Sequence, residues 1–349
     1  MMLVLRLAFP LLIIALFFAS SVLLAAEPTA IESGLVVSEQ GEEKRVGLDQ
    51  ALALLKVPSV SIALIDEGRI AFGDGATPDT LYQAASPSKV VAAIGAMRLV
   101  EAGTLTLDED LNAKLTSWRV PSNDFDATLK VTLRGLLSMT GGIGVPGFLG
   151  CEVGAPLPSL TQILDGTPPA NSPPVTVIAV PGSAYHYSGG GYEIAEALMQ
   201  DVTGKPFPKV MQDLVLCPIG MTASSFAQPL DAVLAAKAAS GHFSDGKELP
   251  GRWHAFPEHA AAGLWSTPTD LAKLLVQLAD GWQGLTSIFL HRQTLQQILT
   301  PQHGGPYGLG VTVAGDGASL VLMKRGQNVG YQGCLMLYQV NNGGNSVIS

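Results

Sequence analysis

The chain has 349 residues and a formal net charge of −9, with 29 acidic against 20 basic side chains. No run of Lys or Arg interrupts this balance, so the composition argues against a nucleic-acid partner. A hydrophobic content of 47% with only 14% charged residues indicates a folded, well-buried chain and excludes a disordered one.

The chain opens with Arg6, followed by a long apolar run from Leu7 that ends in small residues. This pattern is typical of a secretory signal, so we predict a signal peptide over residues 1–26, cleaved near Ala25 or Ala26. The apolar run is also long enough to cross a bilayer, and an uncleaved anchor is the alternative that the sequence leaves open. We therefore expect a periplasmic or secreted protein, which contacts a membrane only if this segment is retained.

Two apolar runs, "SVSIALID" and "RIAFG", predict strands joined by a turn around Glu67-Gly68. The next segment, "SPSKVVAAIGAMRLVEAG", has apolar residues at helical spacing and predicts a buried central helix. At its start Ser86 allows two interpretations. It caps the helix N-terminus, or it is a nucleophile with Lys89 as its helper. The Ser-x-x-Lys spacing is weak evidence by itself, because a second copy in "SDGKELPG" lies in a polar loop.

Helices and Pro/Gly-rich loops follow, and strand patterns return after Pro306. The segments "VTLRGLLSM", "GYEIAEALMQDVTG" and "STPTDLAKLLVQLADG" predict helices, with Thr132 as the cap of the first and Gly204 as the end of the second. In the last, Thr267, Pro268 and Asp270 have the spacing of a capping box. The later segments "YGLGVTVAG", "SLVLMK", "GCLMLYQV" and "NSVIS" predict strands.

Strands at both ends with helices between them predict an α/β (α+β) fold. We expect a mixed antiparallel sheet flanked by helices and built from both chain ends, with an inserted all-helical domain. The sheet domain is predicted to cover residues 27–115 plus 288–349, and the helical domain residues 116–287.

Candidate cofactor and metal motifs fail when their context is considered. The glycine pattern "GIGVPG" at residues 142–147 follows a helix, contains a proline and opens no helix. His254 and His259 in "HAFPEH" are one residue too far apart for a helical zinc signature. We therefore assign no metal and no cofactor.

An exported protein can hold one disulfide, and the sequence does not choose its pair among the three cysteines, Cys151, Cys217 and Cys334.

Two further segments join the Ser-Pro-Ser-Lys motif at Ser86. In "YHYSGGGY", Tyr187 precedes a glycine run, and an apolar strand ends in Lys324-Arg325-Gly326. In this order the three segments resemble the serine β-lactamase and penicillin-binding-protein superfamily. The closest likeness is to its class C-like branch, which includes family VIII esterases and D-aminopeptidase or D,D-peptidase relatives. From about Val57 onward the resemblance extends to "VPSVSIALIDEGRI", "PDTLYQAASPSK", "VEAGTLTLDEDL", "VTLRGLLSMTGG", "DVTGKPF" and "AAAGLWSTPTDLA".

The resemblance implies a β-lactamase/transpeptidase-like fold and an acyl-transfer site, and it favours Ser86 as the nucleophile over Ser86 as a cap. It implies that Tyr187 acts as the base, assisted by Lys89, with Lys324 as a second ammonium group nearby. A free tyrosine titrates near 10, so a base role at neutral pH requires its pKa to fall by about 3 units.

The resemblance also implies how a substrate is held. The backbone N–H groups of Ser86 and Gln327 would form the oxyanion hole, and Gly326 would leave room for a substrate along the strand edge. Gly189 stands where the family usually has Asn, so a substrate-binding amide is missing. This departure weakens the case for β-lactam hydrolysis more than the case for ester hydrolysis.

We therefore expect an exported serine hydrolase that forms an acyl-enzyme with small esters, amides, D-amino-acid peptides or β-lactams. Its partner would be a small-molecule or peptidoglycan-like substrate. The alternatives are a penicillin-recognising or inert homologue without turnover, and an acyltransferase that uses the same serine. Because relatives carry a long helix after their last strand and this chain stops at "NSVIS", we also expect the C-terminal helix to be missing.

Overall fold

A computed structural model describes residues 35–39, 42–66, 69–72, 76–77, 79–282, 289–315, 319–339 and 345–348. The predicted signal peptide and the turn at Glu67-Gly68 lie outside the described residues. Within the described ranges, no helix is long and apolar enough to span a bilayer.

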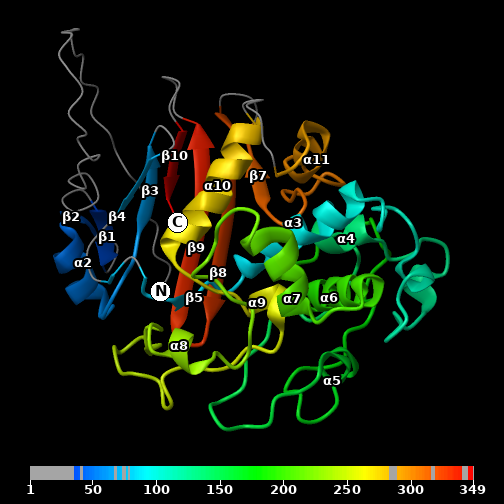
Figure 1. Ribbon diagram of the computed structural model, residues 1–349, viewed down its shortest axis with the longest axis horizontal. Coiled ribbons are helices and arrows are strands. Elements are labelled where there is room, and N and C mark those ends of the chain that lie inside the picture. The colour runs from blue at the N-terminus through cyan, green and yellow to red at the C-terminus, as the bar shows by residue number, and fades with distance from the viewer. Residues whose placement is uncertain are drawn as a thin grey trace, which may run out of the picture.

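Strands from both ends of the chain form one six-stranded antiparallel sheet (Figure 1). Its order is β4-β3-β10-β9-β8-β7, and Ile65 of β3 lies opposite Val347 of β10, which joins the two ends. The predicted fold class and the predicted strands are thus confirmed. The strands of this sheet are β3 (Ala63–Asp66), β4 (Arg69–Phe72), β7 (Thr312–Ala314), β8 (Val321–Asn328), β9 (Tyr331–Gln339) and β10 (Asn345–Ile348).

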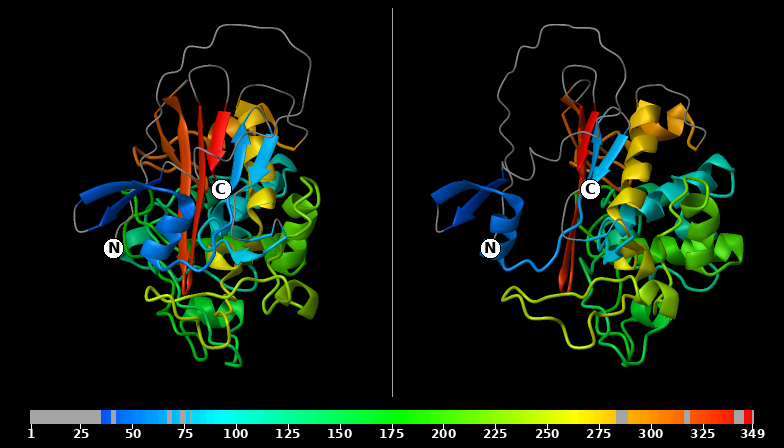
Figure 2. Two further views of the ribbon diagram at one scale, coloured as in Figure 1. Left: turned by 90° about the vertical axis from the view of Figure 1, so that its left-hand side faces the viewer. Right: turned by 60° about the vertical axis from the view of Figure 1, so that its left-hand side comes forward.

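The central helix α3 (Ser88–Glu101) is buried along most of its length, as its all-round apolar sequence predicts. Helix α10 lies along one face of the sheet, and α3 and α6 lie on the same side (Figure 2). The further helices are α4 (Leu133–Leu137), α5 (Leu160–Asp165), α6 (Gly190–Thr203), α7 (Phe207–Met211), α8 (Ala232–Ala235), α9 (His259–Ala262), α10 (Pro268–Trp282) and α11 (Arg292–Ile298).

The helix caps agree with the sequence at two of three places. Thr132 caps α4 by accepting a hydrogen bond from the Gly135 N–H, and α6 ends at Gly204 in the left-handed conformation. At α10, Thr267 accepts from the Asp270 N–H, but the Asp270 carboxylate does not complete the capping box. It accepts instead from the Ser224 hydroxyl and the Ala223 N–H of another segment, and from Lys273 on α10 itself, so contacts outside the cap override the local motif.

An N-terminal hairpin and helix were not predicted. The strands β1 (Leu35–Glu39) and β2 (Glu42–Val46) pair antiparallel, and α2 (Leu48–Leu55) follows them. They form a small apolar cluster of their own on the side of the sheet opposite α10 (Figure 2). A two-stranded pair, β5 (Tyr82–Gln83) with β6 (Trp265–Ser266), leads the chain into α3.

Candidate active site

Ser86 lies just before α3, after Ala85, whose φ of 56° is unusual for a residue with a side chain. Its hydroxyl oxygen accepts hydrogen bonds from Tyr187 OH at 2.8 Å and from Lys89 Nζ at 3.3 Å. The first N–H groups of α3 donate to backbone carbonyls, among them that of Ser86 itself. The Ser86 side chain therefore faces the other predicted site residues and does not cap α3.

Lys89 is one turn along the same face of α3 and is almost fully buried. Its amine donates to the carbonyl oxygen of Ala261 at 2.7 Å and lies 5.3 Å from the centre of the Tyr187 ring. Burial lowers the pKa of Lys89 to about 7, and the negative charge of Glu193 opposes this shift. A lysine with this pKa is an effective proton acceptor near neutral pH.

Lys324, on β8, also contacts Tyr187. Its amine donates to Tyr187 OH at 3.0 Å and lies 4.5 Å from the centre of that ring. The pKa of Lys324 is lowered to about 6, mainly by burial and to a smaller extent by repulsion from Lys89. The structure thus brings four residues from three separate segments, Ser86, Lys89, Tyr187 and Lys324, into one hydrogen-bonded cluster.

The electrostatics of Tyr187 differ from the expectation. Burial raises the pKa of Tyr187 above its ordinary value, and the hydrogen bond to Ser86 opposes the shift only in part. With pKa values lowered to about 7 and about 6, the two buried lysines carry well under two full charges at neutral pH, so they stabilise a phenolate less than two ammonium groups would. In the free site Tyr187 is therefore a neutral phenol, and the amine of Lys89 is the stronger base.

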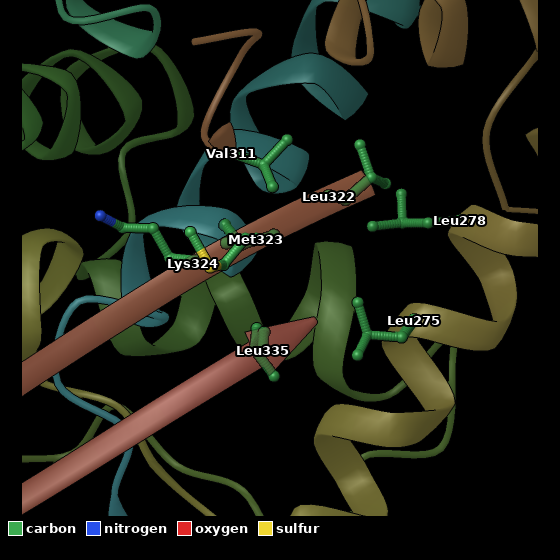
Figure 3. Close-up of a pocket in the computed structure, with 8 residues that line it drawn as sticks. Leu275, Leu278, Val311, Leu322, Met323, Lys324 and Leu335 are labelled. Carbon is green, nitrogen blue, oxygen red and sulfur yellow. The ribbon is translucent and has the colours of Figure 1, made fainter. Parts of the chain in front are cut away.

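An apolar pocket lies behind Lys324 and is distinct from the hydrogen-bonded cluster (Figure 3). The Lys324 amine points away from Leu275 and Leu278, which form the far side of the pocket. Apart from Lys324, the pocket is lined by apolar side chains of α3, α10, β8, β9 and the segment before β7. It offers no polar group for a reaction.

The loop that carries Tyr187 is held by residues whose role the sequence did not reveal. The His186 N–H donates to the carbonyl of Met139 at 2.7 Å, and the Ser188 N–H donates to Met139 Sδ at 3.2 Å. The Ser188 hydroxyl donates in turn to the carbonyl of Gly144 at 2.7 Å. Met139 itself has a φ of 62° and is buried. These contacts hold the phenol of Tyr187 at the serine.

Gly326 lies directly against the nucleophile. A Cβ added there would come within 2.4 Å of Pro87 Cδ and 2.5 Å of the Ser86 backbone nitrogen. Strand β7 pairs with β8 only from Val321 to Met323, so the following residues of β8 border the site. Gln327 is an exposed residue of this strand.

We predict that Gly326→Ala lowers ester turnover by about tenfold or more, because the added methyl would displace the Ser86 backbone, which cannot move aside without moving the hydroxyl. Steady-state kinetics and thermal unfolding of the variant measure this. Gly147→Ala is the matched control, since a Cβ there meets nothing within 4 Å. Equal turnover in the Gly326 variant and the control would contradict the prediction.

Gly189 contributes no side chain to the site, and an aromatic ring takes the adjacent space. A Cβ on Gly189 would lie 3.0 Å from Phe148 Cε2 and 3.3 Å from the carbonyl oxygen of Pro146. Its φ of −71° is open to any residue, so the backbone does not require glycine. The ring of Phe148 and the carbonyl oxygen of Pro146 therefore border the position where the family has its amide.

Buried acidic residues behind Lys89 also went unnoticed in the sequence. Glu193 and Glu196 lie on the buried side of α6, and Glu258 precedes α9. Charged residues at helical spacing among apolar ones were the available signal.

The three cysteines are free thiols, and Cys151 is buried whereas Cys217 is exposed.

The fold and the cluster define a protein of the serine β-lactamase and penicillin-binding type. The Beta-lactamase family model matches residues 48–348, so the chain belongs to the Beta-lactamase family. Protein flp of Staphylococcus aureus (strain N315) is 25% identical over 244 residues, which cover 65% of this chain and 45% of that protein. The chain therefore spans about half the length of the curated relatives it matches.

Solved structures show the same fold. The octameric penicillin-binding protein homologue from Pyrococcus abyssi superposes with a TM-score of 0.68 at 22% identity, covering 86% of this chain and 71% of that one. The D-amino acid amidase from Ochrobactrum anthropi SV3 superposes with a TM-score of 0.63 at 23% identity, covering 82% and 84%. At these identities the likeness extends to the fold, and the activity has to be inferred from the site.

Proposed function

We propose that this chain is an exported serine hydrolase that forms an acyl-enzyme on Ser86. The observation that carries the proposal is the hydrogen-bonded cluster in which the Ser86 hydroxyl contacts both Lys89 and Tyr187. A serine hydroxyl is a weak nucleophile until a neighbouring base takes its proton. A buried lysine amine with a pKa of about 7 at 3.3 Å is such a base.

In the acylation step, Ser86 Oγ forms a bond to the substrate carbonyl carbon while its proton passes to the neutral amine of Lys89. The backbone N–H groups of Ser86 and Gln327 stabilise the oxyanion of the tetrahedral intermediate. The bond to the leaving group then breaks, and the leaving group takes the proton of Tyr187. The lysine ends this step as an ammonium and the tyrosine as a phenolate, next to Lys324.

Deacylation reverses these roles. A water molecule attacks the acyl carbon and gives its proton to the Tyr187 phenolate, and Ser86 Oγ departs with the proton held by Lys89. The two steps consume one water and restore every group to its starting state. The hydrogen bond from Lys324 to Tyr187 OH, at 3.0 Å, supports the phenolate between the steps.

The substrates that this site favours are small esters, amides or D-amino-acid peptides rather than β-lactams. At Gly189 there is no side-chain amide to orient an acylamide group, and the neighbouring surface is the ring of Phe148. A D-amino acid amidase is among the proteins that share this fold, which supports D-amino-acid amides within this substrate class.

The test is hydrolysis of p-nitrophenyl acetate and butyrate by the purified chain, together with intact-mass analysis after treatment with a fluorophosphonate. We expect ester turnover and a single covalent adduct that peptide mapping assigns to Ser86. A folded chain with neither turnover nor adduct would refute the proposal. A stable penicillin adduct without ester turnover would indicate the non-hydrolysing alternative.

We predict that Gly189→Asn raises turnover of a chromogenic β-lactam relative to ester turnover, because the new amide can bind the acylamide group. The Phe148 ring restricts this position, so Gly189→Asn combined with Phe148→Ala should change the ratio more than either single substitution does. Kinetics of both substrates with the three variants measure the effect. A ratio that is flat or lower in the double variant would show that this interpretation of Gly189 is wrong.

A further inference from the structure

Behind Lys89, three buried glutamates surround the short helix α9. Glu193 and Glu196, both on α6, are 0% and 1% exposed, and Glu258, which precedes α9, is 2% exposed. A buried carboxyl group costs stability unless its hydrogen bonds or charge are compensated. The acyl-transfer steps proposed above use none of the three, so their presence requires another explanation.

Two of these carboxyl groups hold the backbone of α9. Glu193 Oε1 accepts from the N–H of Ala261 at 3.1 Å, and Glu196 Oε2 accepts from the N–H of Ala260 at 2.9 Å. Glu196 Oε1 also lies 2.8 Å from His259 Nδ1. Helix α9 packs against both α6, which carries these two glutamates, and α3, which carries the reactive lysine.

The backbone of Ala261 links Glu193 to Lys89 through two hydrogen bonds. Its N–H donates to the Glu193 carboxyl, and its carbonyl oxygen accepts from Lys89 Nζ at 2.7 Å. A displacement of Ala261 would therefore move the acceptor that orients the lysine amine toward Ser86. Glu196 binds the neighbouring residue and has no such direct connection.

We propose that Glu193 is a positioning residue for Lys89: its carboxyl group holds the Ala261 backbone that orients the amine, and its charge acts on that amine. This inference rests on the proposed function, in which Lys89 takes the proton of Ser86. Among the described residues, Glu193 Oε2 has no hydrogen-bond partner, which leaves this oxygen available to carry charge or a proton.

Several other ionisable groups face this pair. Lys89 is faced by Tyr187 and Lys324 at the serine and by Tyr192 of α6, whose ring centre is 5.6 Å from the amine. Glu193 is faced by Glu196, Glu258 and Lys89, and His259 acts on Glu196 and Glu258. Burial and repulsion from the other glutamates raise the pKa of Glu193, whereas Lys89 opposes that shift, so lysine and glutamate stabilise each other's charged forms.

The test is the pH dependence of the rate at which a fluorophosphonate labels Ser86. Glu193→Gln keeps an acceptor for the Ala261 N–H and removes the charge. Without that charge the ammonium of Lys89 is less stable, so the midpoint of the acid limb should move about one pH unit lower. The labelling rate above the midpoint should change much less, because the amide can still hold Ala261.

Glu196→Gln is the matched control, because it removes a carboxyl from the same helix and the same buried cluster. We expect its acid limb to stay at the wild-type midpoint. An unchanged midpoint in Glu193→Gln, or an equal shift in both variants, would overturn the proposal. The first result would show that the charge does not act on Lys89, and the second that any buried carboxyl has this effect.

If Glu193→Gln does not fold, infrared spectroscopy of the wild type beside Lys89→Met tests the same coupling from the other side. Removing the lysine should let a protonated carboxyl band persist to higher pH, because coupling between two sites is reciprocal. Identical titrations would overturn the proposal. A wild type that is labelled at Ser86 but hydrolyses no substrate would refute only the proposed turnover, and the labelling assay would still test Glu193.

Discussion

Ser86→Ala is expected to lower kcat/KM for a chromogenic short-chain ester by about 10³-fold or more, because no other hydroxyl occupies the position between Lys89 and Tyr187 among the described residues. The remaining lysine and tyrosine can still polarise water, so a low residual rate is compatible with the mechanism. Initial rates with p-nitrophenyl butyrate and the loss of the fluorophosphonate adduct measure the effect.

Ser88→Ala is the control, because Ser88 is two residues away in the same turn and has a structural part. Its hydroxyl donates to the carbonyl of Ala85 at 2.5 Å and accepts from the N–H of Leu264 at 3.0 Å. Removing it leaves a buried N–H unpaired, at a cost of about 1–3 kcal/mol in the free energy of unfolding. We expect Ser88→Ala to lose stability but keep turnover. Turnover that persists in Ser86→Ala would refute the serine mechanism.

The second large expected effect is the loss of kcat/KM when Lys89 is protonated or replaced. Because the pKa of Lys89 is lowered to about 7, this residue is an ammonium below that pH and an amine above it. Only the amine can take the proton of Ser86, so kcat/KM should rise with pH through about 7 and then level off. Lys89→Met should lower kcat/KM by about 10² to 10⁴-fold and abolish this rise. The pH profile of ester turnover measures both.

Lys324→Met separates the two lysines, since the pKa of Lys324 is lowered to about 6. This variant should lower turnover, because the hydrogen bond to Tyr187 OH is lost, but it should retain the rise near pH 7, since Lys324 is already largely uncharged where Lys89 titrates. A wild-type profile that rises only in the alkaline range of a tyrosine would show that the Tyr187 phenolate is the base, as the family resemblance implies.

Most of the architecture could be predicted because its signals are local. Apolar periodicity placed α3 and α6, threonine and glycine marked two helix ends, and alternating patterns located the strands at both chain ends. The hairpin of β1 and β2 was missed because "LVVSEQGEEKRV" has few apolar residues after its first three. Its stability comes from the small cluster it forms with α2.

One part of the candidate site could be predicted from the sequence, and the other part only the tertiary structure shows. A spacing of three residues on one helix places Ser86 and Lys89 on one face, and this can be derived from the sequence. Tyr187 lies 101 residues after Ser86, and Lys324 lies 137 residues after Tyr187. Only the tertiary structure shows that these distant segments meet.

The protonation states of Lys89 and Tyr187 could not be predicted from the sequence, for a physical reason. A pKa depends on how completely other segments remove water from a group and on which charges they bring near it. Only the packing of α6 and α9 around Lys89 shows that the lysine loses its proton readily while Tyr187 keeps its own. The sequence thus identified the reacting residue types and their order, and the tertiary structure decided which of them carries the proton and that Glu193 lies behind the base.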